Sequence, residues 1–412
     1  MIYPEALEQW WEAEALSRMK HPKRKTCLHK LVIAADILSD LFTSEREEDF
    51  SGYTQDEEAV LAYGCYFYPQ TFTRVRYAMR ELLQFRQWRP PVEDQSQSEV
   101  GVPAGPRMRV LDLGCGLGAA SMGAVTEMAH QGVTQGMLID AVDQSNLQLE
   151  LLRKLSMDQG NLWPQARWMT HRGNMKTALQ QSVLAQAEGW DMIILSFSLG
   201  EAFFGSDDEQ VLNWLKKLSM KLKPGGLLLV LEPALAETSL RLQRVRDLWL
   251  KQESKPSILG PCLHAQACPM LQRHGTKHWC HEVHSWHVPA LTEEINRKFD
   301  APRHLHELKF SFLALTNDSK LYPEGGDALF RMTSPVVETS GKLQMSGCAA
   351  SGRLNDYDLL TRSFKAKDKK EAKRRARGDI IHSPADKIIR LKGEHQFRLQ
   401  AKEAFAATYQ PH

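Results

Sequence analysis

Short apolar runs alternate with longer amphipathic stretches through the middle of the chain. Five of these runs read MRVLDLG, GMLIDAVD, ARWMTHRG, WDMIILSFS and GGLLLVLEP, the first beginning at Met108 and the last at Gly225. Apolar runs of strand length that are separated by helical patterns are typical of a parallel sheet with covering helices. The run LHELKFSFLAL, residues 305–315, is expected to add a sixth strand. The pattern therefore predicts an α/β fold with a doubly wound sheet.

The N-terminal part of the chain has a different periodicity. In YPQTFTRVRYAMRELLQF, the apolar residues Phe72, Val75, Met79 and Leu82 recur at helical spacing, and arginines fill other positions. The stretch that follows, QWRPPVEDQSQSEVGVPAGP, combines prolines, glycines and small polar residues, which is typical of a linker. We therefore expect a helical region and then a linker before the sheet begins.

The whole pattern divides the chain into six segments. We expect an N-terminal helical region, a linker, a cofactor-binding core, a cysteine-rich insertion, a segment with the last core strands and a small β module, and a basic C-terminal tail, at residues 1–88, 89–106, 107–253, 254–304, 305–354 and 355–412, respectively.

Composition narrows the class of protein. The 412 residues are too many for one ordinary core, and 42% hydrophobic with 25% charged residues is typical of a globular protein without membrane spans. A net charge of +2 indicates no partner by itself. The acidic, aromatic start MIYPEALEQWWEAEALSRMK resembles neither a signal peptide nor a transit peptide, so we expect a cytoplasmic location. Seven cysteines then predict reduced thiols or metal ligands and no disulfide framework.

A glycine loop follows the first predicted strand. In VLDLGCGLGAAS, Gly114, Gly116 and Gly118 allow the backbone to turn sharply and to approach a ligand closely. With Ala119 the loop also satisfies the dinucleotide pattern G-x-G-x-x-A, so the loop alone does not separate the two cofactor classes.

Three details favour S-adenosylmethionine over NAD. Asp112 gives D-x-G-x-G-x-G, which suits a ligand with a cationic amino group and a sulfonium, and Asp143 ends the next strand, where a carboxylate accepts both ribose hydroxyls. The third detail is the stretch LKPGGLLLVLEP, which is typical of the fifth strand of class I methyltransferases. In addition, Asn174 follows the third strand, at a position where adenine is usually contacted. Together they predict a class I methyltransferase fold.

No catalytic residue is identified. Ser196, Ser198 and Glu201 follow the fourth strand and are expected to face the reaction zone or the start of the fourth helix, since open α/β sheets bind ligands at the carboxyl ends of their strands. Of these residues, Ser196 is predicted to bind the cofactor. There is no N-P-P-Y motif, and Cys115 within the glycine loop is interpreted as a small buried residue. Because methyl transfer to a good nucleophile needs mainly positioning, the missing motif does not exclude activity.

The cysteines gather between the fifth and sixth strands. Cys262, Cys268 and Cys280 lie within nineteen residues and are flanked by prolines and histidines, and Cys348 follows much later. The spacing lacks the C-x-x-C pairs that zinc sites usually use. A set of four cysteines suits an iron–sulfur cluster, and a Cys-Pro pair such as Cys268-Pro269 is common in such loops. Zinc, with either Cys348 or a histidine as the fourth ligand, is the alternative, and buried free thiols are the ordinary interpretation of any single cysteine.

These motifs together resemble a known family. The pattern P-C-x5-C-P followed by W-C-H, after a methyltransferase core, is similar to the methyltransferase-like small-ribosomal-subunit assembly factors of mitochondria and their bacterial relatives. The segments AYGCYFYPQTFTRVRYAM and RMTSPVVETSGKLQMSGCAASGRL are similar too, so the resemblance covers residues 60–380. It implies a 4Fe–4S cluster held by Cys262, Cys268, Cys280 and Cys348, and association with the small subunit or its RNA.

The chain departs from the family pattern in the third cysteine. The gap from Cys268 to Cys280 is long and residues 270–278 are rich in His and Lys, so His278 or His281 is a substitute for Cys280. The missing transit peptide favours a bacterial-type cytosolic member of the family.

A basic run lies near the C-terminus. RSFKAKDKKEAKRRAR, residues 362–377, has nine Lys or Arg and two acidic residues. Such a run is either a solvated helix face or tail, or a contact to an RNA backbone. We therefore predict a methyltransferase with an iron–sulfur cluster that acts on or at small-subunit ribosomal RNA. The alternative is a non-catalytic assembly factor that uses the same fold to bind this RNA.

Overall fold

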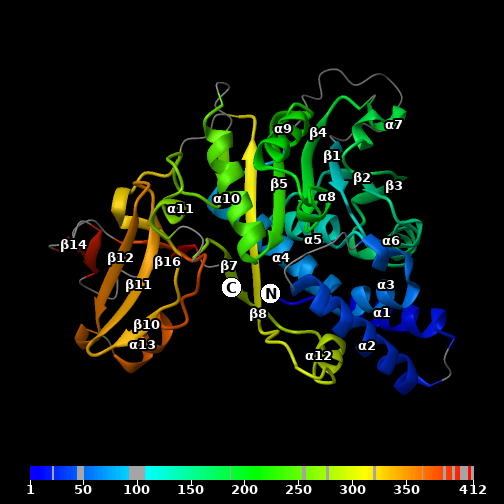
Figure 1. Cartoon of the computed structure of the whole chain (residues 1–412), viewed down its shortest axis with the longest axis horizontal. Helices are drawn as coiled ribbons and strands as arrows, with labels where there is room; N and C mark the ends of the chain where they lie inside the picture. The colour runs from blue at the N-terminus through cyan, green and yellow to red at the C-terminus, as the bar shows by residue number, and fades with distance from the viewer. Residues whose placement is uncertain are drawn as a thin grey trace. The chain divides into compact units, whose positions relative to one another are not determined.

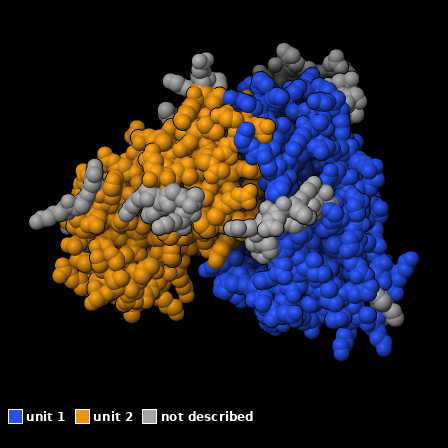
Figure 2. Space-filling model, in the orientation of Figure 1, with its two compact units in different colours: residues 1–207, 213–231, 285–308 blue, residues 208–212, 232–284, 309–412 orange. Residues whose placement is uncertain are grey.

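The chain divides into two units in the computed structural model (Figures 1 and 2). Unit 1 comprises residues 1–207, 213–231 and 285–308, and unit 2 comprises residues 208–212, 232–284 and 309–412. The structure describes residues 1–20, 23–43, 51–91, 107–185, 187–252, 257–274, 278–318, 322–363, 365–383, 387–391, 395–399 and 407–409. Most of the predicted linker, from residue 92 to residue 106, therefore lies outside the described residues.

Helices form the N-terminal part of unit 1, as the periodicity predicts. They are α1 (Glu5–Arg18), α2 (Arg24–Thr43), α3 (Glu57–Tyr66) and α4 (Tyr68–Arg80), and α4 continues into a π-helical turn, Glu81–Phe85. Two glycines allow close packing. A Cβ on Gly64 of α3 would lie 2.3 Å from the ring of Trp11, and one on Gly123 would lie 2.5 Å from the carbonyl oxygen of Phe72. Gly123 thus lets α4 lie directly on the next helix along the chain, α5 (Ala119–His130).

A parallel sheet forms the core of unit 1. Its strands are β1 (Arg107–Leu113), β2 (Gly136–Asp143), β3 (Ala166–Arg172), β4 (Trp190–Ser196) and β5 (Leu222–Pro233). They lie in the order β3-β2-β1-β4-β5, and each neighbouring pair is parallel. The order reverses between β1 and β4, which is the signature of a doubly wound sheet, and ligands of such sheets bind at the carboxyl ends of the strands at this point. The predicted α/β class is confirmed.

Helices connect the strands of this sheet. They are α5, α6 (Asn146–Asp158), α7 (Ser182–Ala185), α8 (Leu199–Ala202) and α9 (Asp208–Ser219), and α12 (Ala290–Asn296) follows later in the chain. The central strand β4 is buried from Trp190 to Leu195, as expected for a strand that is covered on both faces. No helix within the described residues is long and apolar enough to cross a membrane.

Unit 2 begins with a helix and short strands around the cysteine-rich segment. These elements are α10 (Ala236–Leu250), β6 (Ser257–Gly260), α11 (Pro269–His274), β7 (Glu282–Ser285) and β8 (Glu307–Thr316). The strand β8 is the predicted sixth strand, and it pairs with β6 in antiparallel orientation and also with β7.

A second sheet forms the C-terminal module of unit 2, in agreement with the predicted β module. Its strands are β9 (Leu329–Met332), β10 (Val337–Thr339), β11 (Lys342–Ala349), β12 (Leu354–Leu360), β13 (Ile380–His382), β14 (Ile388–Arg390), β15 (Gln396–Leu399) and β16 (Ala407–Tyr409). The main path is β14-β15-β12-β11-β9-β13-β16, and β10 pairs with β11. A short helix, α13 (Ala366–Ala372), lies between β12 and β13 along the chain.

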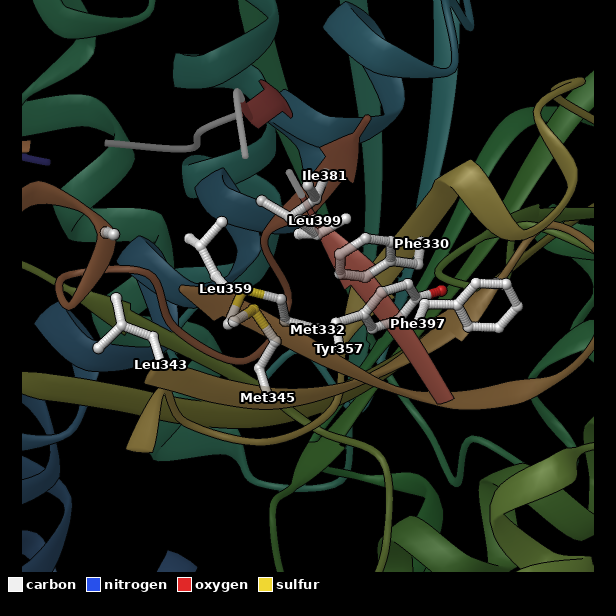
Figure 3. Close-up of a cluster of buried hydrophobic side chains, with 11 residues drawn as sticks. Phe330, Met332, Leu343, Met345, Tyr357, Leu359, Ile381, Phe397 and Leu399 are labelled. Carbon is white, nitrogen blue, oxygen red and sulfur yellow. The ribbon is translucent and has the colours of Figure 1, made fainter. Parts of the chain in front are cut away.

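The core of this module is apolar and rich in aromatic rings (Figure 3). Phe330 and Tyr357 stack with ring centroids 3.8 Å apart, and Phe397 extends the stack from β15. Every second residue of β11 is buried, from Leu343 to Ala349, because successive side chains of a strand point to opposite faces.

Candidate functional site

The glycine loop of unit 1 lies at the carboxyl end of β1. Gly114, Gly116 and Gly118 have φ values of 70°, 52° and 81°, which side chains with a Cβ rarely adopt. A Cβ on Gly114 would lie 2.6 Å from that of Ser198, and one on Gly118 would lie 2.8 Å from Leu152. The positive φ values therefore favour glycine at all three positions, and at Gly114 and Gly118 there is also no space for a Cβ.

Asp112 lies beneath this loop and is only 1% exposed. Its Oδ2 accepts a hydrogen bond from the backbone N–H of Ser121 at 3.2 Å, while its Oδ1 is buried without a hydrogen-bond partner. Burial raises the pKa of Asp112 to about 6, against the hydrogen bonds from Ser121, and the charge of Asp143 raises it further. An unpaired carboxylate oxygen of this kind fits a ligand that brings a cationic or hydrogen-bonding group to the loop.

Asp143 ends β2 beside the same loop. One carboxylate oxygen accepts from the N–H of Gly116 and the other from the N–H of Ser145, each at 2.9 Å. Burial raises the pKa of Asp143, although these backbone hydrogen bonds act in the opposite direction. Each oxygen keeps a further lone pair, so the carboxylate is held in place and can still accept hydrogen bonds from a vicinal diol.

The other two predicted cofactor residues differ in their surroundings. Ser196 ends β4, and its hydroxyl is buried without a hydrogen-bond partner. Asn174 is exposed after β3, and its Oδ1 caps the following turn by accepting from the N–H of Lys176 at 2.9 Å. Because Oδ1 is engaged in the turn, the amide nitrogen is the group of Asn174 that can donate a hydrogen bond to a ligand.

Three residues near the loop were not singled out as cofactor-binding residues from the sequence. The positions of a Cβ on Gly114 and on Gly116 lie 3.5 Å from Met175 Sδ and 3.6 Å from Gln148 Oε1, respectively. Ser198 donates a hydrogen bond to the carbonyl oxygen of Leu113 at 3.1 Å and so ties the end of β4 to the loop. Met175 and Gln148 could not be predicted from the sequence, because they reach the loop from other elements. Only Ser198 could be placed near the site, because it follows the fourth strand.

The four cysteines of the candidate metal site line one cavity in unit 2. They come from four places: Cys262 follows β6, Cys268 precedes α11, Cys280 precedes β7, and Cys348 lies on β11. His264 and His281 line the same cavity, whereas His278 is exposed and is not among its lining residues. The folded chain therefore brings together residues that are up to 86 positions apart in the sequence, from Cys262 to Cys348.

Hydrogen bonds organise the walls of this cavity. His264 Nε2 lies 3.3 Å from the sulfur of Cys348, and the N–H of Cys268 donates to Asp247 Oδ2 at 2.9 Å. The buried guanidinium of Arg246 donates to the carbonyl oxygens of His264, at 2.8 Å, and of Gln266. The loop that presents the first two cysteines is thus fixed to α10.

Burial favours the protonated form of three of the four thiols in this cavity. Burial, together with the neighbouring Cys262, raises the pKa of Cys268 to about 11, and burial also raises the pKa values of Cys280 and Cys348. Burial lowers the pKa of His264 to about 4, so this imidazole is neutral. A metal centre here would have to displace thiol protons.

No group of three or more His, Cys, Asp or Glu side chains in the described part of the chain is arranged to hold a metal ion. None of the seven cysteines, all of which lie within the described residues, forms a disulfide bond. Cys27, Cys65 and Cys115 are buried in unit 1, whereas the residues that line the cysteine cavity belong to unit 2. The burial of Cys115 within the glycine loop agrees with its interpretation as a small filling residue.

The described residues of the basic run 362–377 lie on the 3₁₀ turn Thr361–Ser363, on α13 and on the turns after it, within a folded module and not on a separate tail. Lys369 and Lys373 form ion pairs with Glu338 of β10, and Arg375 is only 8% exposed. Lys370 and Arg374 remain exposed. Part of the local positive charge is therefore neutralised within the module, which lowers the charge that is available to a nucleic acid.

Comparisons with solved structures give only distant similarities. An S-adenosylmethionine-dependent methyltransferase from Clostridium acetobutylicum matches with 15% identity and a TM-score of 0.26, over 39% of this chain and 50% of that chain. TrmN from Thermus thermophilus matches with 20% identity and a TM-score of 0.27, over 43% and 44%. Loganic acid methyltransferase with SAH matches with 13% identity and a TM-score of 0.35, over 63% and 97%. The chain thus spans half of the first of these structures, and the fold assignment rests on strand order.

Comparison of the sequence with protein families identifies the family of the chain, which the distant structural similarities do not. No curated protein matches the chain. A family model described as mitochondrial small ribosomal subunit Rsm22 matches residues 57–382, which include the glycine loop and all four cysteines of the cavity. The mitochondrial description differs from the cytoplasmic location expected from the sequence. With well over half of its length matched, the chain belongs to the Rsm22 family.

Proposed function

We propose that unit 1 binds S-adenosylmethionine at the carboxyl ends of β1, β2 and β4. The observation that carries this proposal is the buried pair Asp112 and Asp143 at the glycine loop, one with an unpaired oxygen and the other held by two backbone N–H groups. Ser196 and Asn174 belong to the same proposed site. When bound, the cofactor supplies a methyl group that its sulfonium activates for transfer to a nucleophile.

Calorimetry with S-adenosylmethionine and with NADH tests this assignment. Asp143→Ala removes the acceptor of the ribose hydroxyls, and the loss of charge-assisted hydrogen bonds of this kind costs about 1.5–3 kcal/mol, or roughly ten- to a hundredfold in affinity. Wild-type protein that binds NADH tightly and S-adenosylmethionine not at all would refute the assignment.

We further propose that unit 2 holds one 4Fe–4S cluster through Cys262, Cys268, Cys280 and Cys348. Support comes from the four thiols that line one mostly apolar cavity, with a neutral His264 and the guanidinium of Arg246 beside them. Because a cluster is larger than a single ion, the four cysteines could hold it without the close grouping of side chains that a single metal ion needs. The buried cation would offset the negative charge of a cluster with four thiolates.

Zinc is the competing occupant of this cavity, with His264 or His281 available as a neutral nitrogen ligand. Purification without air, followed by measurement of iron, acid-labile sulfide and zinc, separates the two. About four irons and four sulfides per chain would support the cluster. One equivalent of zinc without sulfide would refute it.

The proposed role is at the small ribosomal subunit. Membership of the Rsm22 family supports this partner, and we propose that the chain methylates or binds the small-subunit ribosomal RNA. The alternative is a non-catalytic small-subunit assembly factor that uses the same fold to bind this RNA. Transfer of a radioactive methyl group to RNA of immature small subunits distinguishes the two, because binding to these particles without transfer is the result that favours the assembly factor. The cytoplasmic location stays a prediction, which fractionation of cells tests.

A further inference from the structure

Arg74 is a half-buried cation on α4 that has no role in the cofactor site or the cysteine cavity as described above. Its guanidinium carbon lies 5.4 Å from the ring centroid of Phe197, and one of its terminal nitrogens donates to Gln70 Oε1 at 3.3 Å. Its Nε is fully buried and has no hydrogen-bond partner. Within the described residues, no carboxylate forms an ion pair with Arg74.

The neighbouring arginines of α4 differ from Arg74, because both of them have a carboxylate partner. Arg76 and Arg80 both pair with Glu127, at 3.1 and 2.7 Å. Burial lowers the pKa of Arg74 to about 10, and only the hydroxyls of Tyr63 and Tyr66 act in the opposite direction. Since an uncompensated charge away from water destabilises the folded chain, such a group is typical of a site where an anion binds.

The position of Arg74 relates it to the cofactor site. Phe197, over which it lies, directly follows β4 and has a φ of 58°, a conformation that is uncommon for an aromatic residue. The next residue, Ser198, donates to the carbonyl oxygen of Leu113 and fills the space beside Gly114. Arg74 therefore reaches the end of β4 at the point where that strand touches the glycine loop.

The sheet order then determines which part of the ligand comes near. The strand β1 lies between β2 and β4. A ligand whose ribose is held by Asp143 on β2 and whose chain crosses the glycine loop therefore places its far end over β1 and β4. In S-adenosylmethionine this far end is the amino acid, with its carboxylate. Tyr63 lies close enough to both Arg74 and Asp143 for their charges to act on it. Burial is the main cause that raises the pKa of Tyr63, while the charge of Arg74 lowers this pKa and the charge of Asp143 raises it.

We propose that Arg74 binds the carboxylate of the amino-acid end of S-adenosylmethionine. This inference rests on the proposed cofactor site. A guanidinium can hold a carboxylate through two parallel hydrogen bonds, and the buried Nε supplies one donor that needs no rearrangement of other partners. A phosphate of a nucleic-acid substrate shares this chemistry, but the link through Phe197 and Ser198 to the glycine loop favours the cofactor.

Calorimetry with two ligands tests the proposal. S-adenosylhomocysteine carries the amino acid, and 5′-methylthioadenosine has the same adenosine and sulfur without it. In Arg74→Met the affinity for S-adenosylhomocysteine should fall by about ten- to a hundredfold, while the affinity for 5′-methylthioadenosine should not change. Arg74→Lys, which keeps the charge and loses the fork, should recover part of the affinity and serves as the second variant. Arg153→Met, at an exposed arginine of α6, is the matched control and should bind both ligands like the wild type.

The outcomes separate this inference from the proposed function. Equal losses for both ligands in Arg74→Met, with a lower melting temperature, would mean that Arg74 only supports the fold, and would overturn the proposal. Unchanged affinity for S-adenosylhomocysteine with weaker binding of a ribosomal RNA fragment would assign Arg74 to a phosphate and overturn it too. Wild-type protein that binds neither small ligand would instead refute the cofactor site itself, and this inference with it. The expected pattern includes a melting temperature of ligand-free Arg74→Met no lower than that of the wild type, because the substitution removes an unpaired cation.

Discussion

Replacement of Glu127 by glutamine tests how α4 is held on the sheet domain. Glu127 lies on α5 and is completely buried, and its carboxylate accepts hydrogen bonds from Arg76, Arg80 and Gln131. The substitution keeps the shape and removes the charge, which leaves two arginines without their counter-ion. Breaking a buried pair in this way costs about 3–5 kcal/mol, and we expect the lower end because Arg80 is partly exposed. For a unit of this size the melting temperature should fall by roughly 6–12 °C.

The pH dependence of the same variant checks the cause. Hydrogen bonds and charges from Arg80 and Arg76 lower the pKa of Glu127 despite its burial. A depressed pKa in the folded state gives stability that is present above the unfolded pKa, about 4.3, and is lost as the pH falls through the folded value. The difference in melting temperature between wild type and Glu127→Gln should thus shrink in acid. Glu150→Gln, at an exposed glutamate that pairs with Arg18, is the control and should cost less than about 1 kcal/mol. An equally small effect for Glu127→Gln at pH 7 would refute the reasoning.

Three further substitutions give separate tests. Gly114→Ala should abolish measurable S-adenosylmethionine binding in calorimetry, because its positive φ and the close Ser198 leave no room for a Cβ; retained affinity would contradict the role of the loop. Cys348→Ser should lose the bound iron after anaerobic purification while Cys27→Ser retains it, and a full complement of iron in Cys348→Ser would transfer the fourth ligand to a histidine. Replacing the exposed Lys370 and Arg374 with glutamine should weaken RNA binding and reduce its salt dependence by up to about two counter-ions, and an unchanged salt slope would assign the run to solvent.

The sheet and the glycine loop could be predicted because their signals are local. The run from Val110 to Ser121 contains the strand, the turn and the start of the helix within twelve residues, and the positive φ values of its glycines follow from that geometry. The contact of Arg74 with Phe197 could not be predicted in this way. It joins a helix and a strand end that are 123 positions apart, and helical spacing assigned Arg74 only to a polar face.

The cysteine cavity and the basic run also depend on contacts between residues that are far apart in the sequence, which the sequence alone does not reveal. Three of the four cysteines are close in sequence, and their density gave the signal, whereas Cys348 entered the proposed set through its family resemblance. The sequence does not reveal that the basic run is partly neutralised, because Glu338, the partner of Lys369 and Lys373, lies more than thirty residues upstream. Charge counted along a sequence overestimates what a folded surface presents wherever strands return to pair with a helix.

The parallel pairing of β12 with β15 has a consequence for shortened forms of the chain. Residues 356–359 pair with 396–399, so the last strands close one side of β12, and Phe397 completes its aromatic stack. The part of the chain that matches the family model ends at residue 382, before β14 and β15 begin. A protein truncated there would keep the glycine loop and the four cysteines, but it would expose the unpaired N–H and C=O groups of β12 together with an uncovered tyrosine ring. Such an edge is a template for strand addition by other chains, and the truncated protein should aggregate on expression although no residue of either candidate site has been removed.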